Sequence, residues 1–337
     1  MPTESEIISR IRRRAVASPD VIVPIGDDAA VMEFGSADDL IACCDLMIEG
    51  VHFRTSWATP RLIGRKAMAV TLSDVAAMGG SPRFAMISVA LPAGKSSEFV
   101  DELFSGIFEM AEASRVSIIG GDTSSSPDSL FIDTIALGRC ARGRAITRAG
   151  ARPGDRVFVT GSLGASIFGL MLLERGFRLN DNSQNDTEEV LARHAALLKH
   201  LAPAPRLEFG RAIGEAGLAN AMIDISDGLS TDLSHILEES RCGAILRADA
   251  LPVADSVIHL ASGDSEINPL DLALHSGEEY ELLFTSPPED RDGIIELSGA
   301  TGLPVTEIGE IVTGEGLHIE RNGALELAKP RGYEHLK

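Results

Sequence analysis

Short acidic motifs recur where the apolar segments of this chain end, and they constrain the fold more than any other feature. Ile25-Gly26-Asp27-Asp28 closes the first apolar segment, and Gly26 permits a tight turn between two predicted strands. Alone, this motif would be interpreted as an exposed acidic turn. Later apolar segments end in similar motifs, namely Cys44-Asp45, Ser73-Asp74, Gly121-Asp122 and Asp224-Ile225-Ser226-Asp227-Gly228. Carboxylates gathered from several elements need divalent cations to coexist, and oxygen-rich sites suit Mg²⁺. The pattern therefore predicts a Mg²⁺-dependent site for phosphorylated ligands.

Length and charge narrow the possible classes of protein. A chain of 337 residues exceeds the usual size of one compact core, which predicts two domains. The net charge of −20 argues against nucleic acid or an anionic membrane as the main partner, because both attract positive surfaces. Small anionic substrates remain possible if metal ions reverse the local field.

The compartment is predicted from cysteine usage and hydropathy. The four cysteines, Cys43, Cys44, Cys140 and Cys242, have no paired zinc spacing, and adjacent cysteines do not form a plausible structural disulfide. The first 20 residues lack an apolar segment of signal-peptide type, and no apolar run is long enough to span a bilayer. A cytoplasmic protein is expected.

Hydrophobic periodicity predicts alternating strands and helices in both halves. Strands are expected over residues 21–25, 29–34, 40–45, 84–91, 116–119, 130–137, 156–160, 221–225, 243–248, 280–286 and 305–312, with a hairpin turn at Asn322-Gly323. Helices are expected over 4–15, 60–78, from a cap at Ser97, from 164 to 173, and over 187–200, 205–215, 229–239 and 291–297. Residues 176–186 are expected to form a polar loop. This is a mixed α/β (α+β) fold with its domain junction within residues 139–154, which gives domains 1–148 and 149–337.

Two phosphate-binding motifs were weighed and judged weak. Gly94-Lys95-Ser96 resembles the end of a Walker A loop, but Val89 stands where that motif requires glycine. The segment Gly161-Ser162-Leu163-Gly164 precedes a predicted helix, so its amides could hold a phosphate. A plain tight turn is the favoured interpretation of that segment.

The remaining candidate residues each allow both a structural and a functional interpretation. His52 follows Asp45 closely and is either structural or a ligand contact, whereas His194, His200 and His235 lie in predicted helices and carry no signal. At least one of Cys43 and Cys44 should be a buried apolar residue, because neighbouring strand positions face opposite sides. Ser226-Asp227-Gly228 could be a helix cap, but Asp224 and Asp227 can also converge on one cation across a strand-to-helix turn.

Six blocks in order make the chain resemble the thiamine-monophosphate kinase family, within the aminoimidazole-ribonucleotide synthetase-like enzymes. They are Glu49-Gly50-Val51-His52-Phe53, Leu72-Ser73-Asp74-Val75-Ala76-Ala77-Met78-Gly79, Gly120-Gly121-Asp122-Thr123, Thr147-Arg148-Ala149-Gly150, Ile223-Asp224-Ile225-Ser226-Asp227-Gly228-Leu229 and Gly277-Glu278-Glu279-Tyr280-Glu281-Leu282. The resemblance runs to Gly332-Tyr333-Glu334-His335.

The resemblance implies transfer of the γ-phosphoryl group of ATP to thiamine monophosphate. It also implies a homodimer whose amino-terminal sheets pair into a barrel, with residues 1–148 binding Mg-ATP and 149–337 completing the site. By position, it implies Mg²⁺ contacts for Asp28, Cys44, Asp45, Asp74, Asp122, Asp224 and Asp227, ATP contacts for Asp28, Gly121, Asp122, Arg148 and Ser226, and substrate contacts for His52 and Glu278.

Two positions depart from the family pattern. Cys43-Cys44 replaces Ser-Thr before Asp45, and a thiol is a poor Mg²⁺ ligand, so backbone carbonyls are expected to serve instead. Pro330 is matched to the family's aromatic residue near the carboxyl end, which predicts weaker packing on the thiamine.

The chemistry suits direct in-line transfer without a phosphoenzyme. The phosphate nucleophile, with a second pKa near ~6, is mostly ionised at neutral pH, so no covalent or general-base residue is expected. The alternatives are another ATP-dependent enzyme of the same superfamily and a non-catalytic metal- or nucleotide-binding relative.

Overall fold

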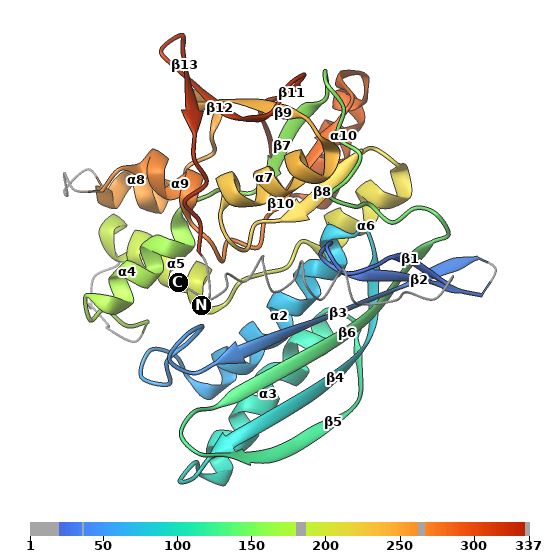
Figure 1. The fold of residues 1–337 in the computed structure, drawn as a ribbon. Coiled ribbons are helices and arrows are strands. Elements are labelled where there is room, and N and C mark those ends of the chain that lie inside the picture. The colour runs from blue at the N-terminus through green and yellow to red at the C-terminus, as the bar shows by residue number, and fades with distance from the viewer. Residues whose placement is uncertain (1–19, 36, 180–186, 262–266, 334–337) are drawn as a thin grey trace.

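The computed structural model describes residues 20–35, 37–179, 187–261 and 267–333 and shows one mixed sheet in each half of the chain (Figure 1). The predicted helix 4–15 and residues 180–186 of the predicted polar loop lie outside the described residues. No described helix is both long and apolar enough to cross a membrane.

The first half is a six-stranded sheet with two long helices. Its elements are β1 (Val21–Val23), β2 (Ala30–Phe34), β3 (Asp38–Ile48), α2 (Pro60–Ala77), β4 (Ser81–Pro92), α3 (Ser97–Ala113), β5 (Ser117–Ser126) and β6 (Phe131–Ala141). The strand order is β1-β2-β3-β6-β4-β5, so β5 forms one edge.

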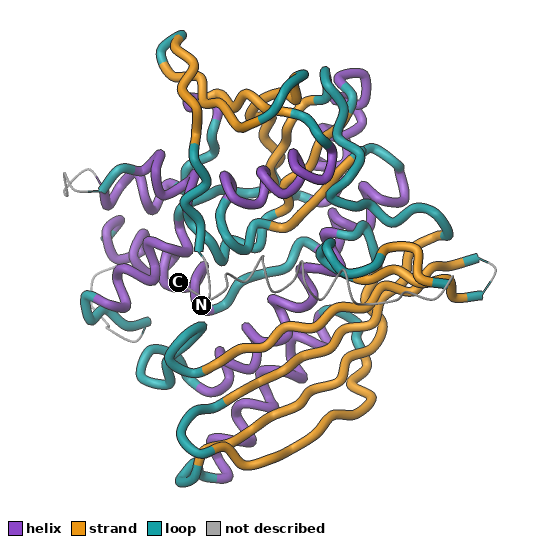
Figure 2. Tube along the Cα trace, viewed as in Figure 1, coloured by secondary structure: helices purple, strands orange, loops and turns teal. Residues whose placement is uncertain are grey.

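Only one face of this sheet is covered by described helices, as Figure 2 shows for α2 and α3. Side chains alternate along each strand, and Ile41, Cys43 and Met47 of β3 are buried in the core that includes these helices. On the other face, Leu46 and Phe84 are 49% and 44% exposed. The sheet therefore presents an uncovered apolar face.

Helix α2 begins and ends where the sequence predicts. Thr59 accepts a hydrogen bond from the Leu62 amide at 3.3 Å, and Pro60 occupies the first turn. The helix stops before Gly79, whose φ of +70° ends the helical path. Because α2 is buried along almost its whole length, it lies at the centre of the molecule rather than on its surface.

The second half is a seven-stranded sheet in the order β13-β12-β9-β11-β7-β10-β8, with helices packed around it. Its elements are β7 (Arg156–Thr160), α4 (Ala165–Glu174), α5 (Glu188–Leu201), α6 (Leu207–Ala216), β8 (Ala221–Asp224), α7 (Leu229–Ser240), β9 (Gly243–Arg247), η1 (Ala248–Ala250), α8 (Asp255–Ala261), α9 (Pro269–His275), β10 (Leu282–Ser286), η2 (Pro288–Asp290), α10 (Arg291–Thr301), β11 (Val305–Val312), β12 (Gly316–Arg321) and β13 (Ala324–Ala328).

The predicted elements are largely present, with three main differences. The strand predicted over 116–119 is the ten-residue β5, because its polar continuation pairs with β4. Ser96, not Ser97, caps α3 by accepting from the Phe99 amide at 3.2 Å. Helices α8 and α9 were not predicted. The hairpin at Asn322-Gly323 is confirmed by positive φ angles of 52° and 77°.

Helix α2 also joins the two halves. Its residues Ala76 and Ala77 share a core with Phe209 and Ile213 of α6. A Cβ on Gly210 would lie 2.4 Å from the carbonyl oxygen of Ala76, so only glycine allows the two helices to approach this closely. As a result, residues of α2 face both the first sheet and the second.

Candidate active site

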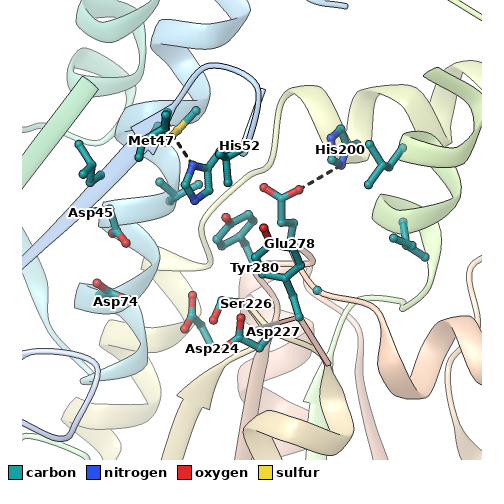
Figure 3. A pocket seen from close by; sticks show the side chains of 18 of the residues that line it. Asp45, Met47, His52, Asp74, His200, Asp224, Ser226, Asp227, Glu278 and Tyr280 are labelled. Carbon is teal, nitrogen blue, oxygen red and sulfur yellow. Dashed lines mark hydrogen bonds and ion pairs between the residues drawn. The ribbon is translucent and has the colours of Figure 1, made fainter. Parts of the chain in front are cut away.

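A cavity of about 510 Å³ lies between the two halves, a volume suited to small-molecule ligands. Figure 3 shows that its labelled side chains form two groups. The carboxylates of Asp45, Asp74, Asp224 and Asp227 lie at one end, which we call the acidic end. At the other end, which we call the His52–Glu278 end, lie His52, Glu278, Tyr280 and His200.

Three separate elements build the acidic end. Asp28 lies in the turn between β1 and β2, Asp74 lies near the end of α2, and Asp224 is the last residue of β8. One carboxylate oxygen of each lies within 4.8 Å of the others. The Ser73 hydroxyl donates a 2.6 Å hydrogen bond to Asp224 Oδ2 and so fixes the contact between the halves.

The chemistry of these donors fits a hard divalent cation. Burial, together with neighbouring carboxylates, raises the pKa of Asp224 to about 8 and that of Asp45 to about 6. Asp28 Oδ2 and Asp45 Oδ2 are buried without a hydrogen-bond donor among the described residues. All of the donors are carboxylate oxygens, which Mg²⁺ prefers. The acidic end is therefore short of positive charge.

Arg148 supplies part of that charge. Its Nη2 lies 2.6 Å from Asp28 Oδ1, and its backbone amide donates to Asp27 Oδ2 at 3.0 Å. Burial opposes the charged form, but the carboxylates of Asp28 and Asp27 keep the pKa of Arg148 above its usual value. One arginine does not neutralise the negative charge of the carboxylate cluster, so the acidic end can still accept a cation.

The turn after β8 presents Ser226 and Asp227 to the cavity. The cap of α7 is made instead by Asp232, whose Oδ2 accepts from the amides of Asp227 and Gly228 at 3.2 and 2.9 Å. The interpretation of Ser226-Asp227 as a mere cap is therefore wrong. Ligand atoms of Asp227, Asp232 and His235 also lie within 4.8 Å of one another.

Gly121 and Asp122 lie away from this cluster within one chain. They belong to β5, and the strand order places β6 and β4 between β5 and Asp45 on β3. Three strand spacings of ~4.8 Å separate β5 from β3 by about 14 Å. The fold itself also requires glycine at position 121, because a Cβ there would lie 1.8 Å from the carbonyl oxygen of Ile87. Within one chain, Asp122 therefore lies apart from the other aspartates.

The two adjacent cysteines face opposite sides of β3. Cys43 is buried and donates to the carbonyl oxygen of Thr71 at 3.3 Å, which confirms the expected buried cysteine. Cys44 is exposed and also contributes to the cavity wall. Because strand side chains alternate, the Cys44 thiol points to the face opposite Asp45, so its side chain is poorly placed to share a cation with that carboxylate.

At the His52–Glu278 end, residues from both halves meet. His52 Nδ1 accepts from the Ile48 amide at 3.0 Å, in the loop after β3. Glu278 precedes β10 and forms an ion pair with Lys66 Nζ at 2.8 Å, while His200 Nδ1 lies 3.4 Å from its other oxygen. Burial lowers the pKa of His200 to about 3, so this imidazole is neutral at pH 7.

The acidic residues after Glu278 anchor the same segment. Glu279 Oε1 accepts from the amides of Gly164 and Ser166 at 2.8 and 3.1 Å, at the start of α4. Glu281 accepts from Thr160 at 2.7 Å and from Lys199 at 2.5 Å, and is also bound by Arg206. The amides of Gly164 and Ser166 therefore hold a carboxylate of the protein, which favours the tight-turn interpretation of Gly161-Ser162-Leu163-Gly164 over a phosphate site.

Several residues at this site were not predicted from the sequence. Lys66 pairs with Glu278, and His200 lines the cavity, but both lie on helices, where only their burial distinguishes them. Tyr280 also lines the cavity. Tyr333 lines the cavity, so the aromatic residue near the carboxyl end is present three positions after Pro330. An aromatic side chain near the carboxyl end is therefore available to the cavity although position 330 is proline.

Both halves match models of one protein family. The AIR synthase related protein N-terminal domain matches residues 26–140, and the corresponding C-terminal domain matches residues 152–322. A thiamine-monophosphate kinase of Rhodopirellula baltica is 36% identical over 98% of this chain and 97% of its own length. That of Salmonella typhimurium is 35% identical, with 98% of each chain covered.

Solved structures agree with these relatives. AaThiL complexed with AMPPCP and TMP is 33% identical, with a TM-score of 0.84 over 99% of this chain and 97% of that one. Thiamine-monophosphate kinase from Stenotrophomonas maltophilia is 34% identical, with a TM-score of 0.78 over 94% and 96%. Escherichia coli HypE, at 20% identity and a TM-score of 0.69, shares the fold.

Proposed function

The chain belongs to the thiamine-monophosphate kinases, within the AIR synthase related proteins, and on that basis we propose that its cavity transfers the γ-phosphoryl group of ATP to thiamine monophosphate, giving thiamine diphosphate and ADP. A relative bound to AMPPCP, an ATP analogue, and TMP supports the two substrates. The observation that carries the proposal is the single cavity in which a carboxylate cluster and the His52–Glu278 end face each other.

We place the ATP phosphates at the acidic end. Asp28, Asp45, Asp74, Asp224 and Asp227 would hold Mg²⁺ there. Oxygens of Asp28, Asp74 and Asp224 lie within 4.8 Å of one another, and one buried oxygen each of Asp28 and Asp45 has no donor among the described residues. Mg²⁺ bound there supplies positive charge that offsets repulsion between the phosphates, which is about 4 kcal/mol for unit charges ~4 Å apart at an effective dielectric of ~20. Arg148 and Ser226 contact ATP in this arrangement.

We place thiamine monophosphate at the opposite end, against His52 and Glu278. The cavity walls then hold the substrate phosphate in line with the γ-phosphate, and closeness in that orientation is the main contribution of the protein. The substrate phosphate needs no base at neutral pH, because its second pKa is near ~6. His200, whose pKa burial lowers to about 3, would be a weak base at neutral pH.

The uncovered apolar face supports the proposed homodimer. Phe84 and Met86 of β4 pair with Leu137 and Ile135 of β6 on the face that carries the exposed Leu46. Such a face normally packs against a partner, and a second copy of the sheet would close a barrel without edges. The barrel over two chains is our proposal for this face.

The same dimer accounts for Gly121 and Asp122. Beyond Ala42, β3 has a partner strand only on its β6 side, and β5 is paired only with β4, so both leave edges open in the described chain. Two-fold pairing of these edges brings the partner subunit's Asp122 beside Asp45. We infer that each site draws its Gly121 and Asp122 contacts from the partner.

One assay tests the function directly. The purified protein is incubated with ATP, Mg²⁺ and thiamine monophosphate, and thiamine diphosphate and ADP are quantified. We expect equal amounts of both products with wild type and neither with Asp74→Asn. Binding of ATP without formation of thiamine diphosphate would instead identify a non-catalytic relative, and product from a different acceptor would identify another enzyme of the superfamily.

We also propose a cytoplasmic location. Cys43, Cys44, Cys140 and Cys242 are all unpaired, as a reducing compartment maintains. A fusion of the chain to a fluorescent protein, imaged in its host cells, tests the location, and a peripheral or exported signal would contradict it.

A further inference from the structure

Lys66 is a buried cation in the apolar middle of α2. Its side chain is 3% exposed, and its helix neighbours Ile63, Ala67 and Val70 belong to the core. Burying an ammonium group without compensation costs several kcal/mol, so a lysine here requires a specific partner. The reaction proposed above makes no use of this lysine.

The contacts of Lys66 join the two halves of the molecule. Its Nζ lies 2.8 Å from Glu278 Oε1, in the second half, and donates to the backbone carbonyl of His52 at 3.4 Å, in the first half. Figure 3 shows His52 and Glu278 facing each other across the same part of the cavity. One ammonium group therefore contacts both residues of the proposed substrate end.

Lys66 is the lysine that pairs with Glu278 among the described residues. The described ion pairs of Glu278 are those with Lys66 and His200, and His200 is neutral at pH 7. Burial opposes ionisation of Glu278, but Lys66, followed by the nearby imidazoles, outweighs it and holds the pKa of the carboxyl group below its usual value. Glu278 thus presents an ionised carboxylate, which can accept a hydrogen bond from a ligand N–H group or face a ligand cation.

The backbone at Glu278 is fixed independently of Lys66. Glu278 and Tyr280 both have positive φ angles, of 59° and 51°, which are strained for residues other than glycine. The Glu278 amide donates to the Ser226 carbonyl at 2.7 Å, and the Tyr280 amide donates to the Ile225 carbonyl at 2.9 Å. These backbone hydrogen bonds fix the position of the Glu278 Cα atom, whereas the ion pair with Lys66 fixes the position of the Glu278 carboxylate.

We propose that Lys66 is a positioning residue for thiamine monophosphate: it orients the Glu278 carboxylate and holds the His52 loop at the spacing that this substrate requires. The inference rests on the proposed function. Lys66 acts through Glu278 and His52, since its own side chain is almost fully covered. Its effect should therefore be confined to one of the two substrates.

Replacement of Lys66 tests the proposal. In Lys66→Met we expect KM for thiamine monophosphate to rise at least about tenfold, as for loss of a charge-assisted contact, with KM for ATP changed by less than about twofold. Lys66→Arg, which keeps the charge, should recover part of the loss. Arg65→Met is the matched control, because Arg65 precedes Lys66 on the same helix and has no ion pair with Glu278 among the described residues, and it should behave like wild type.

A double-variant cycle separates positioning from a purely structural role. If Lys66 acts through Glu278, Lys66→Met should cost little further affinity in a Glu278→Gln background, measured by calorimetry with thiamine monophosphate and a non-hydrolysable ATP analogue. The double variant has neither the lysine nor the glutamate charge, so it leaves no buried charge unpaired. Its affinity can be compared with that of Glu278→Gln even if Lys66→Met alone fails to fold. Additive losses, or equal changes in both KM values, would overturn the inference. Wild type without kinase activity would instead refute the proposed function.

Discussion

At the scale of single residues, the acidic end contains repulsion that the metal-free chain cannot relieve. Asp28, Asp74 and Asp224 place oxygens within 4.8 Å of one another, and Arg148 is the cation in direct contact with them among the described residues. Burial, together with Asp45, Asp224 and Asp28, raises the pKa of Asp74 well above its usual value. The cluster therefore opposes folding without a cation.

Asp74→Asn should consequently be more stable than wild type in the absence of metal. A raised carboxyl pKa in the folded chain means that stability is lost as pH rises through the range between the unfolded and folded pKa values, so at pH 7 the loss is present. Removing the charge should raise the metal-free free energy of unfolding by about 1 kcal/mol or more. Urea unfolding with EDTA measures this gain.

The same variant should lose its response to metal and its turnover. Mg²⁺ should raise the unfolding temperature of wild type and leave Asp74→Asn nearly unchanged, because ligands that bind only the folded state stabilise it. Turnover should fall by about 10²-fold or more. An equal Mg²⁺ response in both proteins would show that the cation binds elsewhere.

His200 should make the fold sensitive to mild acid. The unfolded imidazole takes up a proton near its usual pKa of 6.5, whereas the buried one does so only near 3, so lowering the pH through this window favours the unfolded chain. Between pH 7 and pH 5, wild type should lose about 2 kcal/mol more than His200→Gln. Denaturant unfolding at several pH values measures the difference, and parallel pH profiles would contradict it.

At the scale of elements, α2 organises the site. It carries Lys66 toward Glu278, Ser73 toward Asp224 and Asp74 into the acidic end, from one buried surface of one helix. Because α2 packs on both sheets, its position sets the distance between the two ends of the cavity. Strand β5 matters for a different reason, since it carries Gly121 and Asp122 on an open edge.

Gly121→Ala should disrupt β5, whereas Gly120→Ala should not. A Cβ at Gly121 would lie 1.8 Å from the Ile87 carbonyl oxygen, and its φ is +154°, while a Cβ at Gly120 meets nothing within 4 Å. We expect Gly121→Ala to cost about 2 kcal/mol or more and Gly120→Ala to change stability by less than about 1 kcal/mol. Urea unfolding of the Gly121→Ala and Gly120→Ala variants tests whether glycine at position 121 is needed for strand pairing.

At the scale of the whole molecule, the site is proposed to need two chains. Asp45→Asn and Asp122→Asn should each inactivate the homodimer. In a heterodimer of the two variants, purified through two different tags, one site carries both substitutions and the other carries neither, so about half of the wild-type activity should return. A heterodimer as inactive as its parents would show that Asp122 acts within its own chain.

The order and type of most elements could be predicted from the sequence because they depend on local patterns. Thr59-Pro60 marks the start of α2, and Asn322-Gly323 marks a hairpin, without help from the rest of the chain. The acidic motifs indicated that Asp28, Asp74 and Asp224 form a carboxylate cluster, because each lies at or near the end of an element, where a short side chain can reach a shared site. The ordered blocks were enough to identify the family.

Only the tertiary structure decided which distant segments meet. It separated Asp122 from the other aspartates, paired Lys66 with Glu278, used Glu279 to cap α4, and brought Tyr333 to the cavity. Each of these depends on how far apart two elements lie after packing, which no local pattern encodes. The sequence by itself therefore determined which chemistry is available, and the packing of α2 between two sheets determined where that chemistry is assembled.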